Sequence, residues 1–173
     1  PYFLNLKTPG EAVKAVNDLY KFAISQNYHS SESSQISGFL YPFIDPEKFD
    51  KNKPNLNAIP YGGYAIVHGN DVEIYAVWGN NEGVQSLVAD HYLIEINGNK
   101  FFIRKKEIPQ KNKMICSTDD SPADIIDTPA EIQFTQVLSD NEILEVTRVL
   151  AQLFQKYGPQ RVEFTADSQG LIF

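Results

Sequence analysis

Cysteine and histidine are scarce in this sequence, and their scarcity limits the sites it can form. Of the 173 residues, one is a cysteine, Cys116, and three are histidines. A single cysteine excludes an internal disulfide and a multi-cysteine metal site. Cys116 also lacks a basic neighbour placed to activate it, so we expect it to be inert. His29, His68 and His91 lie in separate contexts without the spacing of metal ligands. They are predicted to be ordinary loop or strand residues.

Long apolar runs and excess positive charge are also missing. None of the apolar segments approaches the ~18 residues that a membrane helix needs, so no membrane partner is expected. With no signal segment in view, we expect a reducing, cytoplasmic setting. Lysine and arginine total 15 against 22 aspartates and glutamates, which gives a net charge of −7. A general nucleic-acid binder carries the opposite balance, so no nucleic-acid partner is expected either.

What the chain does have is enough apolar sequence for a core. The 42% apolar fraction is typical of a globular protein. A length of 173 residues suits about one domain, so we predict a single domain over residues 1–173. The sequence starts at Pro1 and stops within the apolar run 171–173, whereas natural domains usually end in polar, frayed segments. We therefore expect this domain to be a fragment of a larger one.

Strand signals dominate the middle of the chain. Gly69-Asn70-Asp71 and Asn97-Gly98-Asn99-Lys100 each separate two apolar runs, which is typical of hairpins. Residues 45–60 are polar and predict a long surface loop, and residues 105–136, with three prolines, predict an irregular segment. The predicted strands are residues 36–44, 61–68, 72–78, 91–96, 101–104, 162–165 and 171–173.

Two segments have helical periodicity. Residues 11–24 repeat apolar side chains at three- and four-residue spacing, and Thr8 with Glu11 has the spacing of a capping box. Ser139 with Glu142 has the same spacing at the start of a second apolar-periodic segment, which Gly158-Pro159 ends. The order of helix, two hairpins, helix and hairpin predicts an α+β fold, with helices on one face of a mostly antiparallel sheet.

Glu163 is the acidic residue of most interest. It lies between Val162 and Phe164 in a predicted strand, so alternation places it on the opposite face from these two apolar side chains. A lone acid in that position is commonly part of a solvated face, and this reading stays open. The glycine-flanked loop after Trp78, residues 79–83, follows a strand and is a weaker candidate for a ligand-binding segment.

Two ordered stretches together resemble the ATP-grasp domain of phosphoenolpyruvate synthase and pyruvate phosphate dikinase. The first is residues 74–84 (IYAVWGNNEGV) followed by Ala89-Asp90-His91-Tyr92. It is similar to the family's Trp-Gly-Leu-Gly-Glu loop and Pro-Asp-x-Tyr strand. The second comprises residues 138–142, 156–160 and 162–164, which resemble the family's closing helix, Tyr-Gly-x-Pro-Gln corner and Asp-Ile-Glu-Trp strand. Order and spacing agree over roughly residues 37–173.

The resemblance implies a nucleotide-binding fragment of a phosphotransferase. Such a domain holds ATP in a cleft between two subdomains, with metal ions on the phosphates, and passes a phosphoryl group to a histidine on another domain. Glu163 matches the acid that holds the metal, and Glu82 matches the loop glutamate. The strand 40–44 matches the one that faces adenine, which implies Leu40, Tyr41, Phe43 and Ile44 as contacts. ATP and Mg²⁺ are expected only in the complete domain. Its other ATP-grasp subdomain and the phosphohistidine domain are the implied partners.

Three departures from the family pattern bear on activity. Arg161 stands where the family has an aspartate two residues before the metal-binding glutamate, Tyr75 where it often has a glutamate, and Asn80-Asn81 where it has Leu-Gly. An arginine in place of an aspartate beside a metal reverses a Coulomb term of several kcal/mol at ~5 Å and an effective dielectric constant of ~20. Alternation places Arg161 on the same face as Glu163.

Three interpretations therefore remain. The chain is a fragment of an ATP-binding phosphotransferase domain that does not catalyse the reaction by itself. Alternatively, it is a non-catalytic relative that uses the ATP-grasp-like fold as a binding or scaffold module. In the third interpretation it is an unrelated α+β domain, which a structure without one sheet carrying both Trp78 and Glu163 would establish.

Overall fold

The computed structural model describes residues 8–25, 55–118, 123–167 and 170–173. The chain divides into two compact units, residues 1–44 and residues 45–173, and each is described by itself. The single domain expected over residues 1–173 stays a prediction. No helix among the described residues is long and apolar enough to cross a membrane.

The first unit contains the helix α1 (Pro9–Ser25), which confirms the helix predicted from periodicity. The Thr8 backbone N–H donates to the Glu11 carboxylate over 3.0 Å, and the Glu11 backbone N–H donates to the Thr8 hydroxyl over 3.2 Å. These two bonds form the predicted capping box, which satisfies N–H groups that the first turn leaves without intrahelical partners. The strand predicted at 36–44 lies outside the described residues.

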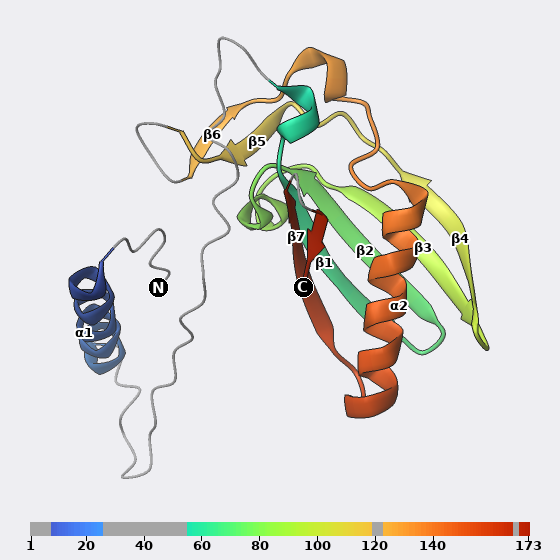
Figure 1. The fold of residues 1–173 in the computed structure, drawn as a ribbon, viewed down its shortest axis with the longest axis horizontal. Helices are drawn as coiled ribbons and strands as arrows, with labels where there is room; N and C mark the ends of the chain where they lie inside the picture. The colour runs from blue at the N-terminus through green and yellow to red at the C-terminus, as the bar shows by residue number, and fades with distance from the viewer. Residues whose placement is uncertain (1–7, 26–54, 119–122, 168–169) are drawn as a thin grey trace. The chain divides into compact units, whose positions relative to one another are not determined.

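A six-stranded antiparallel sheet forms the second unit's framework, with the order β4-β3-β2-β1-β7-β8 (Figure 1). Both predicted hairpins are confirmed, as is the final strand pair. The criterion for the third interpretation is not met, because Trp78 in β2 and Glu163 in β7 belong to one sheet. The strands are β1 (Tyr61–His68), β2 (Asp71–Trp78), β3 (Asp90–Asn97), β4 (Lys100–Glu107), β7 (Arg161–Asp167) and β8 (Gly170–Ile172).

The helix α2 (Asp140–Tyr157) crosses one face of this sheet (Figure 1). Ser139 caps it through the predicted capping box with Glu142. Alternate residues of the strands meet one apolar side of the helix and form the main core, in agreement with the predicted α+β arrangement. The buried residues of this core are Ala65, Val67, Val72, Ile74, Ala76, Tyr92, Ile94, Val137, Leu138, Ile143, Val146, Leu150 and Phe164.

The prediction that residues 105–136 are irregular is wrong. β4 continues to Glu107, and a second, two-stranded sheet pairs β5 (Lys113–Cys116) with β6 (Asp124–Asp127). Two 3₁₀ turns also occur, η1 (Leu56–Ala58) in the predicted loop and η3 (Ala130–Ile132) in the predicted irregular segment. Each strand of the small sheet has only four residues, which are too few for a clear alternation pattern, and prolines interrupt the sequence around both strands.

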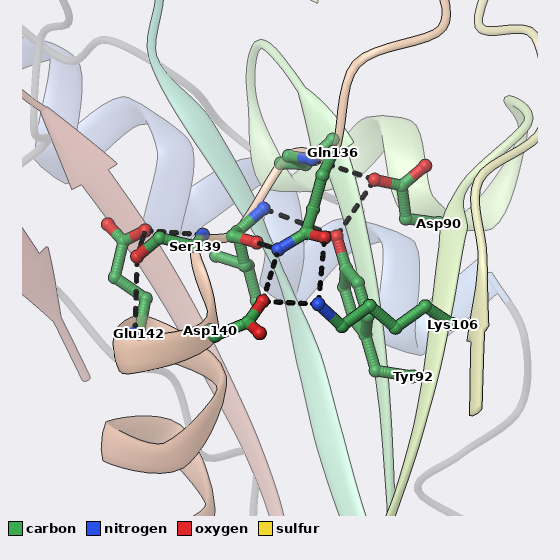
Figure 2. Close-up of polar contacts among 9 residues, drawn as sticks. Asp90, Tyr92, Lys106, Gln136, Ser139, Asp140 and Glu142 are labelled. Atoms are coloured by element: carbon green, nitrogen blue, oxygen red, sulfur yellow. Dashed lines mark hydrogen bonds and ion pairs between the residues drawn. The ribbon is translucent and has the colours of Figure 1, made fainter. Parts of the chain in front are cut away.

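A buried polar network fixes the chain where it enters α2 (Figure 2). The Asp90 carboxylate, which is fully buried, accepts hydrogen bonds from the Val137 backbone N–H (2.7 Å) and the Tyr92 hydroxyl (2.8 Å). The same hydroxyl accepts from the Leu138 backbone N–H at 3.2 Å. Lys111, which is 1% exposed, places its Nζ 2.5 Å from Asp90. Burial raises the pKa of Tyr92 far above its usual value, so its hydroxyl stays protonated and donates.

A second set of contacts at the same helix end joins β4 to α2 (Figure 2). The Lys106 Nζ pairs with the Asp140 carboxylate and lies 3.2 Å from the Gln136 side-chain oxygen. The Gln136 amide nitrogen donates to the same carboxylate over 3.0 Å. The hydrogen bond from Lys106, which has the largest effect, and that from Gln136 hold the pKa of Asp140 below its usual value. A carboxylate in the first turn also interacts favourably with the helix dipole.

Candidate functional site

The sheet face opposite α2 carries many polar and aromatic side chains along with a few apolar ones. One residue from each of five adjacent strands lies directly opposite the next in the antiparallel register. We call these residues the cross-strand row: Glu163 (β7), Tyr64 (β1), Tyr75 (β2), His91 (β3) and Glu107 (β4). In β1, β2, β3 and β7 the row residues have the opposite alternation phase from the core residues, and Glu107 joins them through the register shift in the β3–β4 pairing, so the row lies on the face turned away from α2.

Glu163 is held at one end of this row by two neighbours. The side-chain amide of Asn81 donates to its Oε2 over 3.3 Å, and an Arg161 guanidinium nitrogen lies 3.3 Å from its Oε1. The Arg161 guanidinium also lies 4.0 Å above the ring centroid of Tyr64, a cation–π contact. These contacts confirm that Arg161 and Glu163 share a face. The Glu163 side chain is 58% exposed, so the described residues supply one side of any cleft around it.

Asn81 reaches Glu163 because the loop after β2 folds over the sheet. The loop runs from Gly79 into the 3₁₀ turn η2 (Asn81–Gln85). Gly79 has a φ of +86°, and a Cβ there would lie 2.1 Å from the Ile115 carbonyl oxygen of β5. A Cβ on Gly62 of β1 would lie 3.1 Å from the Cβ of Asn81. Glycine at these two positions therefore permits the close approach that brings Asn81 to β7.

The remaining row residues stack on one another across the sheet. The rings of Tyr64 and Tyr75 are 5.0 Å apart, and those of Tyr75 and His91 are 4.6 Å apart, both nearly parallel. The Tyr75 hydroxyl donates to Glu73 over 2.7 Å, and this bond, together with burial, raises the pKa of Tyr75 to about 12. His91 lies 3.0 Å from Glu107 and 3.3 Å from Glu73 through its two ring nitrogens. The ring faces thus contact each other, which leaves mainly ring edges and hydroxyls for a ligand.

The carboxylates at the acidic end of the row have partners within the sheet. Lys105 and His91 hydrogen-bond to the Glu107 carboxylate. These bonds hold the pKa of Glu107 below its usual value, and the bond from Lys105 has the larger effect. Glu73 is engaged by Tyr75 and His91. At the other end the Arg161 side chain is 45% exposed and lies 3.3 Å from the Glu163 carboxylate, so the two charges largely offset each other. The guanidinium N–H groups that Glu163 does not occupy are candidate donors to an anionic ligand.

The predicted site residues fall into three groups. Glu163 lies on the expected face, next to the loop that the sequence singled out. Glu82 lies exposed in η2, and the printed contact from this loop to Glu163 comes from the preceding residue, Asn81. The four predicted adenine contacts lie outside the described residues, namely Leu40, Tyr41, Phe43 and Ile44. Their roles, the loop role of Glu82 and the metal role of Glu163 stay predictions.

Sequence reasoning missed the cross-strand row and Asn81. Tyr64 and Tyr75 could have been paired from the first hairpin alone, because its turn fixes which residues lie opposite each other. His91 was assigned no role, although its position one strand further along follows from the same register. The neighbours of Glu163 were less accessible, because β1 and β7 are about a hundred residues apart in sequence and pair only in the folded sheet.

Most of the second unit matches a known protein family. Residues 63–173 match the family described as "Pyruvate phosphate dikinase, AMP/ATP-binding domain". The chain belongs to this family. A curated protein of Methanocaldococcus jannaschii, named probable phosphoenolpyruvate synthase, is 31% identical to the chain over 98 residues. The aligned residues cover 55% of this chain and 8% of that protein, so the chain spans a small part of its relative's length.

Several residues that carry the family resemblance have structural positions here. Asp90 and Tyr92 belong to the buried network that fixes the start of α2. Trp78 packs against the main core and against a second, smaller apolar cluster that includes Ile132. Its indole N–H donates to the Ile132 carbonyl over 3.2 Å. Gly79 admits the close approach of β5. These family motifs therefore preserve the fold around the β2–β3 connection, and the exposed face near Glu163 holds the residues free to contact a ligand.

A divalent metal ion does not fit the described residues as they stand. Both oxygens of Glu163 already face hydrogen-bond donors, and a guanidinium lies beside the carboxylate. Within the described ranges, no three His, Cys, Asp or Glu side chains converge as metal ligands. Mg²⁺ prefers several oxygen ligands in near-octahedral geometry. A cation at Glu163 would therefore need ligands from outside the described residues and a displaced Arg161.

Proposed function

We propose that this chain is part of the ATP-binding domain of a phosphotransferase that resembles phosphoenolpyruvate synthase, and that it does not catalyse the reaction by itself. The observation that carries the proposal is the position of Glu163. It lies on the sheet face left open by α2, beside the loop 79–83 and the Arg161 guanidinium. The family membership supports a nucleotide as the ligand.

In this proposal the chain supplies one wall of the nucleotide site. The phosphates lie at the β7 end of the face, near Asn81, Arg161 and Glu163, because the guanidinium of Arg161 has N–H donors beyond its contact with Glu163. Adenine contacts by Leu40, Tyr41, Phe43 and Ile44 stay an expectation from the family resemblance. The opposite wall, the phosphohistidine domain and Mg²⁺ belong to the complete protein. Phosphoryl transfer needs positioned cations around the phosphates, and one exposed guanidinium is too few.

The expected affinity of the isolated chain for ATP is therefore low, with a dissociation constant of ~0.1–10 mM. Ligand-observed saturation-transfer NMR measures binding in this range. Tyr64→Glu places a negative charge beside the proposed phosphates and removes the ring beneath Arg161, so it should weaken binding at least tenfold. Asn81→Asp adds a charge at the same end and should act in the same direction.

Tyr157→Glu is the matched control, because Tyr157 is exposed at the end of α2, away from the cross-strand row. Its dissociation constant should stay within about twofold of the parent value. Circular dichroism verifies that each variant folds. The absence of saturable ATP binding, or binding that Tyr64→Glu and Asn81→Asp leave unchanged, contradicts the proposed site. Micromolar affinity or phosphoryl transfer by the isolated chain contradicts its proposed role as an inactive part.

A second function is favoured by the departures around the site. Arg161 pairs with Glu163 where the family places a second acid, and Asn81 occupies the other carboxylate oxygen. A non-catalytic ATP-grasp-like binding or scaffold module would keep the sheet and lose the catalytic charges in this way. The sequence of the parent protein separates the two functions. An upstream subdomain rich in arginine and a Gln-x-Arg segment after Phe173 support the enzyme, and their absence supports the module.

A further inference from the structure

Arg161 is held as a rigid cation on the open face of the sheet. One guanidinium nitrogen lies 3.3 Å from Glu163, and the guanidinium carbon lies 4.0 Å from the Tyr64 ring centroid. A guanidinium carries five N–H donors in a fixed fork, and one nitrogen takes part in the contact with Glu163. The side chain is 45% exposed, so the remaining donors can reach a ligand.

We propose that Arg161 contacts the nucleotide phosphate directly and that nucleotide binding by this chain does not depend on a divalent metal ion. This inference rests on the proposed function. Guanidinium and phosphate form paired, charge-assisted hydrogen bonds, which are stronger than hydrogen bonds between neutral groups. Because Tyr64 and Glu163 already restrict the side chain, less conformational entropy is lost when the phosphate binds.

The surroundings of Glu163 do not favour a metal ion at this position. A Mg²⁺ ion bound to Glu163 would lie next to the positive charge of Arg161 and would have to displace the donors of Arg161 and Asn81. Phosphate oxygens require no such displacement, because they can accept hydrogen bonds from the guanidinium N–H groups of Arg161 that Glu163 does not occupy. Glu163 then acts as a positioning residue, which orients the guanidinium and does not coordinate a metal.

The experiment measures the dissociation constant of ATP for the 173-residue chain in EDTA and in excess Mg²⁺, again by saturation-transfer NMR. The two constants should agree within about threefold. In EDTA, Arg161→Gln should weaken binding roughly tenfold or more, the range expected when a hydrogen bond to a charged group is lost. Arg161→Lys keeps the charge without the fork and should lie between the parent and Arg161→Gln.

Arg148→Gln is the matched control, because Arg148 is exposed on α2 and away from the cross-strand row. It should leave the ATP affinity in EDTA unchanged within about twofold. Arg161→Asp restores the family's acid and should make binding dependent on Mg²⁺. A chain that binds ATP only with Mg²⁺, or that binds equally well after Arg161→Gln, overturns the inference and leaves the proposed function standing. No ATP binding in either condition overturns both.

Discussion

Replacing Asp90 with asparagine tests the buried network that joins β3 to the start of α2. The substitution keeps the size of the side chain and removes its charge, so any effect comes from electrostatics and hydrogen bonding and not from a cavity. Asp90 is fully buried and accepts from the Lys111 ammonium, the Tyr92 hydroxyl and the Val137 backbone N–H. In Asp90→Asn an amide nitrogen replaces one carboxylate oxygen. A hydrogen-bond donor then faces the donors from which that oxygen accepted.

The magnitude follows mainly from Lys111. Its side chain is 1% exposed, and besides Asp90 it contacts the Pro109 carbonyl oxygen at 3.1 Å. Removing one partner of a buried ion pair leaves the other charge uncompensated, which costs about 3–5 kcal/mol. We therefore expect Asp90→Asn to lower the free energy of unfolding by about 3–5 kcal/mol. This is a large part of the 5–15 kcal/mol typical of a domain.

Urea denaturation followed by the fluorescence of Trp78, the one tryptophan, measures this change. Asp71→Asn, at the exposed start of β2, is the matched control and should change stability by less than about 0.5 kcal/mol. The double variant Asp90→Asn with Lys111→Met removes both charges and should be more stable than Asp90→Asn alone. A loss below about 1 kcal/mol, or strictly additive effects in the double variant, would refute the reasoning.

Two further predictions concern the β5 strand and its contact with the loop 79–83. Gly79→Ala forces a side chain at positive φ against the Ile115 carbonyl oxygen, so it should cost at least about 3 kcal/mol in urea denaturation. Gly98→Ala, at a φ of +60° with open space around it, should cost about 1 kcal/mol; equal costs would contradict the close approach. Burial raises the pKa of the Cys116 thiol to about 12, so a thiol reagent at pH 8.5 should label it only after unfolding. The stabilisation from the neutral thiol is complete below its ordinary pKa of 9.0 and is lost as pH rises toward 12; rapid labelling of the native chain would contradict this burial.

Local signals in the sequence determined most of the elements that were predicted correctly. The second hairpin has an Asn-Gly turn between apolar runs, and α2 has a capping box and a regular apolar face. The small sheet lacked such signals. Its strands have four residues each, and its position depends on a contact between Gly79 and Ile115 that only the folded chain brings together.

In the candidate site, too, the features that depend on local sequence were predicted and those that depend on distant strands were not. The face of Glu163 followed from alternation within one strand, and so did its shared face with Arg161. The contact with Asn81 and the alignment with Tyr64 depend on β1 lying next to β7, which requires the whole sheet to be formed. Local patterns indicate which way a side chain points, whereas the register between distant strands determines which side chains it meets.

The most direct test of the proposed nucleotide site is a map of ATP-induced chemical-shift changes on the ¹⁵N-labelled chain. The account predicts that the largest changes fall on β7, the adjoining part of β1 and the loop 79–83, around Asn81, Arg161 and Glu163. The backbone of α2, from Asp140 to Tyr157, should change little. Changes concentrated on α2 or on the β5–β6 sheet, with the β7 end of the cross-strand row unaffected, would contradict it.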